Sequence, residues 1–589
     1  MAEYIAPLRD MRFVINDLIG LERLQALAGF DEITADLSDA VLEEAAKLAS
    51  EVLSPLNRVG DTVGCRWEDG VVTTPPGWRE AYRAFCEGGW NGLAMNPEFG
   101  GQGLPKVLAT AVGEMWDAAN MAFGLCPLLT GGAIEAIEQH GSDALRATFL
   151  AQLISGTWTG TMNLTEPQAG SDLSAVRTRA VPNGDHYLIT GQKIFITYGE
   201  HDLTDNILHL VLARLPDAPE GTRGISLFAV PKFLVNADGS LGRRNDLRCV
   251  SIEHKLGIHG SPTAVMSYGD NGGAVGYLVG ELNRGLMHMF TMMNAARHAV
   301  GREGVAIAER AYQKALEHAR ERVQGQAPGA GPRATIVEHP DVKRMLMSMK
   351  CQIEAMRALA FLCAVEYDTA ALHPDAEVRA RAERRGDMLT PIVKAWSTET
   401  GVQIASLGVQ VHGGMGYVEE TGAAQHLRDS RIAPIYEGTT GIQAGDLVGR
   451  KTLRDGGHAM RELIADMRAT IADLQAQGGT VALTRDALAA AVDDLETVVA
   501  WICGAASDPR LPAAAAVSYL ELAGLTCGGW LMAQAAARAA AAGEGDDFHR
   551  AKLASAGFYA AQILPRTAAL ARIITQGSAL VAELDTALL

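Results

Sequence analysis

The stretch from Arg428 to Gln443 reads RDSRIAPIYEGTTGIQ and places one carboxylate, Glu437, among apolar residues and turn formers. Gly438 follows directly, so the backbone can turn there and a ligand can approach closely. Removal from water raises the pKa of a carboxyl group, which suits a general base working near neutral pH. Glu437 is therefore a candidate catalytic base. The alternatives are a solvated loop residue and a helix cap.

A second polar stretch, TMNLTEPQAGSD, covers residues 161–172. Gly170 and Ser171 can present backbone N–H groups beside a hydroxyl, a combination suited to an oxygen-rich anion. Thr165 can donate a hydrogen bond to a heteroatom of a ring. An ordinary polar turn is the alternative, because Pro167 and Gly170 favour a turn whatever the function.

Short β-branched and aromatic runs follow, namely HYLITGQKIFIT, NILHLVLAR and GISLFAVPK. Their period of two and the Gly, Pro and Asn breaks between them predict a small antiparallel β domain. Within the first run, Lys193–Thr197 reads KIFIT. Phe195 in this run is either a core residue or a contact for a ligand ring.

A long amphipathic pattern, NAARHAVGREGVAIAERAYQKALEHARER, then predicts a bundle helix. Its Arg297 and Arg322 are 25 positions apart, about seven turns at 3.6 residues each. A straight helix would place both on one face, and exposed helix arginines are the alternative. Further on, the stretch QVHGGMGY contains two adjacent glycines, Gly413 and Gly414. They could let the backbone come close to another group, or they could form the C-cap of a helix.

Four of these stretches, TEPQAGSD, KIFIT, QVHGGMG and YEGT, resemble in order and spacing the motifs of the acyl-CoA dehydrogenase family. The resemblance runs from about Asp36 to Gly449. It implies non-covalent FAD and the family's α+β fold. It also implies that Glu437 removes the α-proton of an acyl-CoA thioester while the β-hydrogen leaves as hydride to flavin N5, giving a trans-2-enoyl-CoA.

The resemblance further implies which residues bind the two ligands. Those that would contact FAD are Met162, Leu164, Thr165, Gly170, Ser171, Phe195, Thr197, Arg322, Gln410, Gly413, Gly414, Thr439 and Gly441. Those that would contact the acyl-CoA are Ser171, Arg297 and Gly438. The Glu437 backbone N–H and a flavin ribityl hydroxyl would donate to the thioester carbonyl.

Three positions depart from the family pattern. Phe195 replaces the usual tryptophan, which keeps ring packing but loses the indole N–H. Gly325 stands where an aromatic residue follows the second arginine, so one adenine-side contact is missing. Gly441 stands where many relatives have glutamine, and it can offer only backbone contacts.

The expected architecture is an acyl-CoA dehydrogenase fold with an additional domain. Its parts are an N-terminal extension over 1–35, a helical N-terminal domain over 36–156, a middle antiparallel β domain over 157–280, a helical bundle with the catalytic glutamate over 281–451, and an Ala- and Leu-rich helical domain over 452–589. The expected anchors of the extension are Tyr4, Ile5, Pro7, Met11 and Phe13. Ser38 is the expected N-cap of a helix that Pro55 ends.

Length and composition predict several soluble domains, because 589 residues exceed what one hydrophobic core supports. A content of 48% hydrophobic and 20% charged residues is typical of globular proteins. We see no membrane-spanning run and no signal peptide, which predicts a cytoplasmic protein. The eight cysteines lack a C-x-x-C pair and histidines at zinc spacing, so we expect reduced thiols and no metal site.

The predicted activity is that of a dehydrogenase that passes electrons to an electron-transfer flavoprotein. An acyl-CoA oxidase is the alternative, since oxygen access has no sequence signature. A DNA-binding stress protein on the same scaffold would need a basic C-terminal domain. Residues 456–589 instead hold 9 Lys+Arg against 14 Asp+Glu, a net of −5, and the whole chain carries −18. We therefore expect no nucleic-acid partner.

A G-x-G-x-x-G motif between a strand and a helix is absent from the sequence, which disfavours NAD. The N-terminal YIAPLRDMRF and the C-terminal extension resemble an extended branch of the family, whose substrates are 3-methylmercaptopropionyl-CoA and fatty acyl-CoA thioesters. In the family, Arg322 and the Gln410–Gly414 block reach the FAD of a neighbouring subunit. Shorter members are commonly tetramers. The added domain would cover the second face, which predicts a homodimer.

Overall fold

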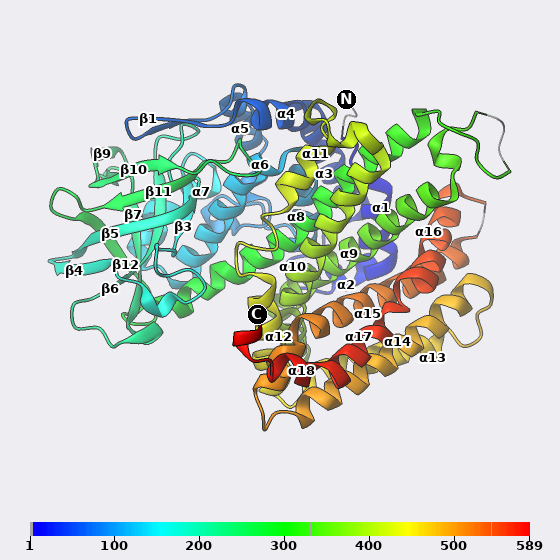
Figure 1. Cartoon of the computed structure of the whole chain (residues 1–589). Helices are drawn as coiled ribbons and strands as arrows, with labels where there is room; N and C mark the ends of the chain where they lie inside the picture. Colours follow the sequence, from blue (N-terminus) through cyan, green and yellow to red (C-terminus); the bar gives the residue numbers. More distant parts are fainter. Residues whose placement is uncertain (1–3, 330–332, 544) are drawn as a thin grey trace. The chain divides into compact units, whose positions relative to one another are not determined.

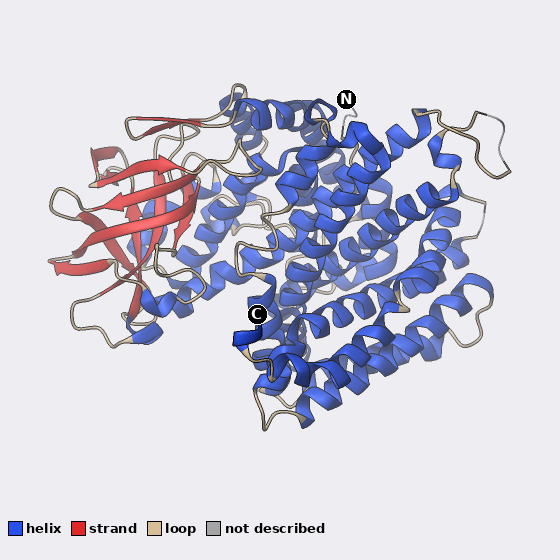
Figure 2. Cartoon of the chain, viewed as in Figure 1, coloured by secondary structure: helices blue, strands red, loops and turns tan. Residues whose placement is uncertain are grey.

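The computed structural model describes residues 4–329, 333–543 and 545–589. The chain forms two compact units, one made of Met1–Glu44, Pro105–Glu114 and Val300–Leu589, and the other of Ala45–Leu104 and Met115–Ala299. Helices α6 (Lys106–His140) and α8 (Gly285–Glu321) contribute residues to both. The strands gather into one main sheet, and most of the remaining chain is helical (Figure 2).

The main sheet follows the runs of alternating residues that the sequence predicts. Its strands are β3 (Thr159–Asn163), β4 (Arg179–Asn183), β5 (His186–Thr197), β6 (Ile207–Arg214), β7 (Ile225–Pro231), β10 (Leu247–Ile252), β11 (Thr263–Tyr268) and β12 (Ala274–Val279). Their order is β10-β11-β5-β12-β7-β6-β3, and β4 pairs with β5 and β6. The expectation of an antiparallel sheet was wrong for β4, which forms a parallel bridge to β6, and at the β3 edge. There β3 runs parallel to β6, because β4 and β5 intervene in the chain and allow the long connection that parallel pairing needs.

The same unit contains shorter elements around this sheet. They are β1 (Arg66–Glu68), β2 (Val71–Thr73), β8 (Phe233–Val235), β9 (Leu241–Arg244), α4 (Ser54–Val63), α5 (Trp78–Glu87) and α7 (Asp143–Ile154). Strand β7 is buried along its whole length, as expected for an apolar run inside a covered sheet. The core residues of β3, β6 and β7 pack with those of α7.

The helical unit is built on α9 (Pro340–Leu372) and α10 (Ala376–His412), which pack along each other (Figure 1). The loop that carries Glu437 lies between α11 (Ala423–Ser430) and α12 (Thr440–Val448). The additional helices are α13 (His458–Asp473), α14 (Gly479–Gly504), α15 (Arg510–Ala542), α16 (Asp547–Phe558), α17 (Arg566–Arg572) and α18 (Ser578–Ala582). A Cβ at Gly524 of α15 would lie 2.4 Å from the Trp396 side chain, so this glycine lets α15 pack closely on α10.

The N-terminal extension is ordered as predicted, through α1 (Leu8–Arg12), a π-helical segment (Phe13–Gly20) and α2 (Leu21–Gln25). Tyr4, Met11 and Phe13 are buried, but Ile5 is 72% exposed, so its assignment as an anchor was wrong. The first three residues of the extension lie outside the described residues. Figure 1 shows α1 and α2 in blue.

The next predicted helix begins earlier and continues further than expected. Helix α3 (Ala35–Lys47) begins before Ser38, which is buried inside it rather than capping it. A π-helical segment (Leu48–Leu53) then leads into α4, where Pro55 occupies the first turn. The backbone N–H that proline lacks has no intrahelical partner in a first turn, so Pro55 begins a helix instead of ending one.

A buried cluster of charges ties distant parts of the helical unit together. Arg357 on α9 donates to Glu114 over 2.6 and 2.9 Å, to Asp10 over 2.6 Å and to Glu309 over 2.8 Å. Lys552 on α16 donates to Asp10 and, over 2.9 Å, to Glu354. The cluster therefore joins the first helix of the chain to the additional domain.

Burial alone would raise the pKa of the Asp10 carboxyl, but Lys552 and Arg357 hold it well below its usual range. Burial raises the pKa of Glu114 to about 6 in spite of the nearby Arg357 guanidinium. Lys552 and Arg357 thus lower the pKa of Asp10 more than Arg357 lowers that of Glu114.

Two helices, α6 and α15, are long and apolar enough to cross a membrane by length and composition alone. In their most apolar stretches, however, 78% and 67% of the residues are buried inside the protein. Burial of this extent is typical of the core helices of soluble proteins, which can also be long and apolar enough to span a membrane. All eight cysteines are free thiols and five of them are buried, which fits the expected reduced packing residues.

Candidate active site

The structure brings the 161–172 stretch and the KIFIT strand together. The Thr161 hydroxyl donates to the Thr197 carbonyl over 2.7 Å, and the Ile194 N–H donates to the Thr165 carbonyl over 2.9 Å. The Lys193 ammonium donates to the Leu164 carbonyl over 2.9 Å. Two stretches that the sequence predicted to share one ligand therefore form one surface.

A buried ion pair that the sequence analysis missed holds this surface. Glu166 is 3% exposed, and one of its carboxylate oxygens accepts from Lys193 over 2.9 Å. The carboxylate also accepts from Thr178 over 2.6 and 3.0 Å and from the Arg177 N–H over 2.7 Å. Glu166 and Lys193 both lie inside motifs quoted in the sequence analysis. The opposite charges of these two residues are the sequence feature from which the ion pair could have been predicted.

These contacts set the charge state of the pair. Burial alone would raise the pKa of Glu166, but Lys193 and the hydrogen bonds from Thr178 and Arg177 lower it to about 2. Burial lowers the pKa of Lys193 to about 8, and the Glu166 carboxylate offsets part of that fall. At neutral pH the loop is thus tied to β5 by a charged pair.

Phe195 lies at an irregularity of β5 where two of its residues face one residue of β11. Its φ of +59° is in the left-handed region, and its side chain is 59% exposed. A β-bulge next to a binding site re-aims a side chain in this way. Phe195 is therefore an outward-facing aromatic rather than a core residue.

The surroundings of this ring fit a flavin. Thr165 and Thr197 are half-buried hydroxyls, while Gly170 and Ser171 are exposed and a Cβ at Gly170 would meet no atom within 4 Å. Open backbone and hydroxyls beside an exposed ring suit an oxygen-rich aromatic cofactor. Met162 and Leu164 instead pack their side chains against the core, which leaves their backbone for ligand contact.

In the helical unit, Glu437 has a φ of +53° and is half-buried. The Tyr436 hydroxyl donates to Glu303 of α8, whereas Ile435 is 47% exposed and does not shield the carboxylate as an apolar neighbour would. Thr439 caps α12 by accepting from the Ile442 N–H over 3.3 Å.

Glycines 438 and 441 flank this cap. Gly438 has a φ of +90°, and a Cβ there would lie 2.5 Å from the Gln443 side chain, so the position requires glycine. Gly441 lies in the first turn of α12 and is exposed.

The predicted FAD residues from the neighbouring motifs lie at the surface of the same unit. Arg322 follows the last residue of α8 and is exposed, and Gln410 is exposed near the end of α10. The end of α8 and the end of α10 contact each other through His318 and His412, whose rings stack with centroids 4.4 Å apart. A Cβ at Gly413 or Gly414 would meet no atom within 4 Å, so their backbone is open to a ligand.

Arg297 and Arg322, predicted to lie along one face of a straight helix, differ in exposure. Arg297 is 4% exposed, and its guanidinium lies 5.9 Å from the centre of the Phe290 ring. Arg322 is exposed and lies just past the end of α8. The Arg322 N–H donates to the His318 carbonyl over 2.9 Å, so the hydrogen bonding of α8 extends to Arg322.

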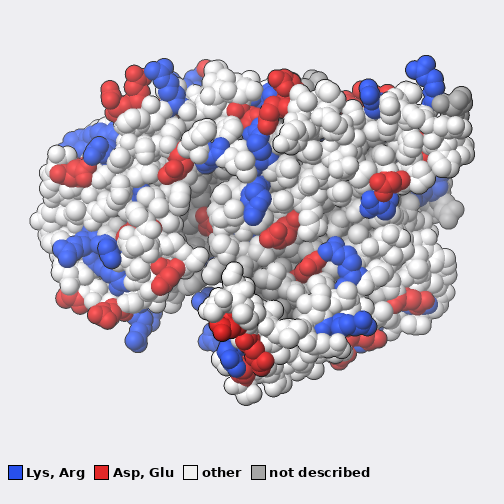
Figure 3. Space-filling view, in the orientation of Figure 1, with Lys and Arg blue, Asp and Glu red and all other residues white. Residues whose placement is uncertain are grey.

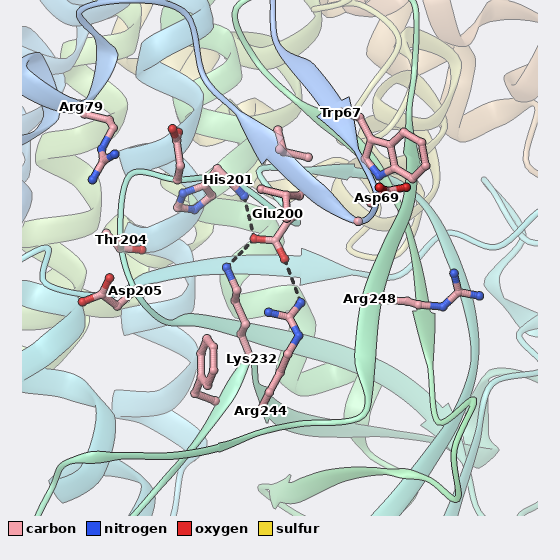
Figure 4. Close-up of a pocket in the computed structure, with 15 residues that line it drawn as sticks. Trp67, Asp69, Arg79, Glu200, His201, Thr204, Asp205, Lys232, Arg244 and Arg248 are labelled. Carbon is pink, nitrogen blue, oxygen red and sulfur yellow. Dashed lines mark hydrogen bonds and ion pairs between the residues drawn. The ribbon is translucent and has the colours of Figure 1, made fainter.

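A cavity of about 830 Å³ lies elsewhere, and none of the predicted site residues lines it. Figure 4 shows Lys232 and Arg244 converging on Glu200 in this cavity. Nearby, Asp202 accepts from Thr74 over 2.6 and 3.0 Å. Because these charges are paired with one another, the cavity is not assigned to catalysis.

Four family models match consecutive parts of the chain. They are the acyl-CoA dehydrogenase N-terminal domain over residues 38–157, the middle domain over 161–270, the C-terminal domain over 283–453, and an acetyl-CoA dehydrogenase C-terminal-like domain over 463–585. The matches follow the predicted order of helical, β, helical and additional helical parts.

The chain is 51% identical to the 3-methylmercaptopropionyl-CoA dehydrogenase of Ruegeria pomeroyi, over 95% of this chain and 96% of that protein. It is 32% identical to a broad-specificity linear acyl-CoA dehydrogenase of Mycobacterium tuberculosis, over 100% of both chains. A solved acyl-CoA dehydrogenase of Bacillus anthracis complexed with FAD shares the fold, with a TM-score of 0.74 and 19% identity over 98% of this chain and 93% of that chain.

This chain therefore belongs to the acyl-CoA dehydrogenase family of FAD-dependent oxidoreductases. The predicted family, fold, cofactor and acyl-CoA dehydrogenation are confirmed. The roles of the individual site residues remain predictions.

We predict that Lys193→Met lowers FAD affinity at least about tenfold, because the loop over residues 164–166 loses its tie to β5 and Glu166 loses its cation. Removing one partner of a buried pair costs about 3–5 kcal/mol. The flavin-to-protein ratio after desalting measures the effect. Lys232→Met is the matched control, since it breaks the buried Lys232–Glu200 pair of the same unit, which lies at the 830 Å³ cavity. Equal FAD loss in both variants would contradict the prediction.

Proposed function

We propose that this protein oxidises an acyl-CoA thioester to the trans-2-enoyl-CoA, with Glu437 as the base that removes the α-proton. The observation that carries the assignment is the left-handed backbone of Glu437, a non-glycine residue with φ +53°. Such a conformation persists only where the surroundings impose it, and it is typical of active sites. When bound, FAD supplies the acceptor for the β-hydrogen.

Glu437 serves this reaction twice. Its carboxylate accepts the α-proton, and its backbone N–H donates to the thioester carbonyl oxygen, where negative charge develops as the proton leaves. One such donor is typically worth about 3 kcal/mol in the transition state. Gly438, whose φ is +90°, lets the thioester approach the backbone.

The cofactor would be held by the surface around Phe195, with the hydroxyls of Thr165 and Thr197 and the open backbone at Gly170 and Ser171 beside it. These groups orient the ring and bind its polar edge. The Arg297 guanidinium, buried on α8, is proposed to lie near the thioester end of the substrate.

Glu437→Gln should keep the protein folded and yellow while lowering turnover about 10²–10⁴-fold. The amide is nearly isosteric but cannot accept the α-proton, so the loss belongs to catalysis and not to packing. Steady-state turnover with a dye acceptor measures the effect. Glu419→Gln, which removes an exposed carboxylate paired with Arg428, is the control and should remain active. Near wild-type turnover of Glu437→Gln would exclude Glu437 as the base.

The proposed substrate is 3-methylmercaptopropionyl-CoA, and the 51% identical relative supports this choice. The runner-up is a linear fatty acyl-CoA, which the Mycobacterium tuberculosis relative supports. The proposed acceptor is an electron-transfer flavoprotein, as the family resemblance implies.

We expect 3-methylmercaptopropionyl-CoA to give the highest kcat/KM in a panel with butyryl-, octanoyl- and palmitoyl-CoA. A mismatch of one methylene in a fitted pocket costs about tenfold or more. Pentanoyl-CoA is the matched control, because only the thioether sulfur distinguishes its acyl chain. A maximum at octanoyl- or palmitoyl-CoA would contradict the proposed substrate. The same assays with oxygen alone should show little turnover, and fast oxygen-dependent turnover would identify an oxidase instead.

A role as a DNA-binding stress protein finds no support in the charge distribution. On the face drawn in Figure 3, acidic and basic side chains of the described residues are interspersed, with no broad basic area. DNA binding would need such an area to neutralise phosphates. The proposed location is the cytoplasm, a reducing compartment that suits eight free thiols.

A homodimer is the proposed assembly. Arg322 and Gln410 are exposed, and close to the open Gly413 and Gly414 the side chains of Met415 and Tyr417 are 52% and 89% exposed. An exposed aromatic beside apolar neighbours is typical of a subunit interface. The FAD site is proposed to be completed across it.

Light scattering of the FAD-loaded protein should give twice the 62.5 kDa mass of one chain. Tyr417→Lys should shift the mass toward that of one chain and lower FAD retention, because the same contact would hold the adenine side of the cofactor. Leu580→Lys alters another exposed apolar residue, on α18, and is the control. A monomer that retains FAD contradicts the shared site, and a stable tetramer contradicts the proposed role of the additional domain.

A further inference from the structure

The loop that carries Glu437 has two consecutive residues in the left-handed region, Glu437 at φ +53° and Gly438 at φ +90°. Glycine adopts this conformation freely, but a residue with a Cβ does not. If Glu437 relaxed to an ordinary φ near −60°, that torsion would rotate by roughly 110° and the carboxylate would leave its present direction. Contacts from outside the loop must therefore hold this backbone.

The first contact comes from Lys394 on α10, whose side chain is fully buried. Its ammonium donates to the carbonyl oxygens of Ala433 and Gly438, both over 2.8 Å. These two carbonyls lie on either side of Glu437 in the sequence. A buried cation is unfavourable unless its N–H groups make hydrogen bonds. The Lys394 ammonium makes them to the backbone of the loop.

The second contact comes from Gln443 on α12, which is also fully buried. Its side-chain amide donates to the Glu437 carbonyl over 3.1 Å and to the Gly438 carbonyl over 3.4 Å. The Gly438 carbonyl is thus bound from two sides. Fixing the carbonyls of residues 437 and 438 fixes the planes of the two peptides on either side of Gly438, and the first of these is the peptide that leaves Glu437.

We propose that Lys394 and Gln443 are positioning residues for Glu437, which together bind three carbonyl oxygens of its loop and impose the backbone that aims its carboxylate at the substrate. This inference rests on the proposed role of Glu437 as the base. Both act through the peptide groups around Glu437, which direct its carboxylate and its backbone N–H.

Lys394→Met keeps the length and packing of the side chain and removes its donors. We expect kcat to fall about 100-fold, the loss typical of a catalytic group misplaced by about 1 Å. KM should stay within about threefold, and the kinetic isotope effect with α-dideuterated acyl-CoA should rise because proton removal becomes more rate-limiting. Gln443→Leu should act in the same direction, by about tenfold in kcat, because it leaves the Lys394 contacts in place.

Lys552→Met is the matched control. It removes another buried lysine of the same unit, one that binds Asp10 and Glu354 and not the loop. It should lower the melting temperature and leave kcat and the isotope effect unchanged. A purely structural role for Lys394 would make the two lysine variants alike.

The measurements are made on FAD-loaded protein, with Glu437→Gln alongside. If Lys394→Met and Gln443→Leu keep kcat within threefold and an unchanged isotope effect while Glu437→Gln is inactive, the positioning role is overturned and the base stands. If Glu437→Gln is active, the proposed base itself fails. Should Lys394→Met not yield a folded flavoprotein, Gln443→Leu decides the question on the same readouts.

Discussion

The guanidinium of Arg357 faces three carboxylates that come from distant parts of the sequence, Asp10, Glu114 and Glu309. Taking so many charges out of water is costly, and a buried group of this kind holds only while every partner is in place. Each of these acids also fixes a helix, namely α1, the start of α6 and α8. The register of the helices in this unit depends on that one cation.

The consequence reaches the catalytic loop through helix packing. Arg357 lies on α9, which packs along α10, and α10 carries Lys394 toward the carbonyls around Glu437. Glu303, which binds Tyr436, lies on α8 within two turns of Glu309. The loop thus contacts α10 and α8, two helices of the unit that contains the buried charges.

Much of the fold could be predicted from the sequence, because periodicity and motif order are local properties. The β domain, the long helices and the additional helical domain follow from them directly. The pairing of β3 with β6 could not be predicted, since a period of two does not reveal strand direction. Likewise Pro55 was expected to end a helix, and its place in a first turn depends on the residues before it.

In the candidate site, too, the local motifs could be predicted from the sequence and the long-range contacts could not. Two of the quoted motif stretches lie against each other. The side chains that hold them were not predicted: Lys394 contacts carbonyls 39 and 44 positions away, and Lys193 reaches Glu166 across 27. Phe195 faces outward because of a bulge, which depends on the register of β5 against β11. Contacts between residues this far apart leave no local pattern.

The pairing of Asp10 with Lys552 bears on how the chain is made. The two residues are 542 positions apart. At synthesis rates of about 5–20 residues per second, on the order of 30–110 s separates their appearance at the ribosome. Until Lys552 has been made, Asp10 lacks one of its cations, and so does Glu354 once it has been made. A chain that stops before α16 never completes the cluster. The charge pair can therefore form only after α16 has been synthesised.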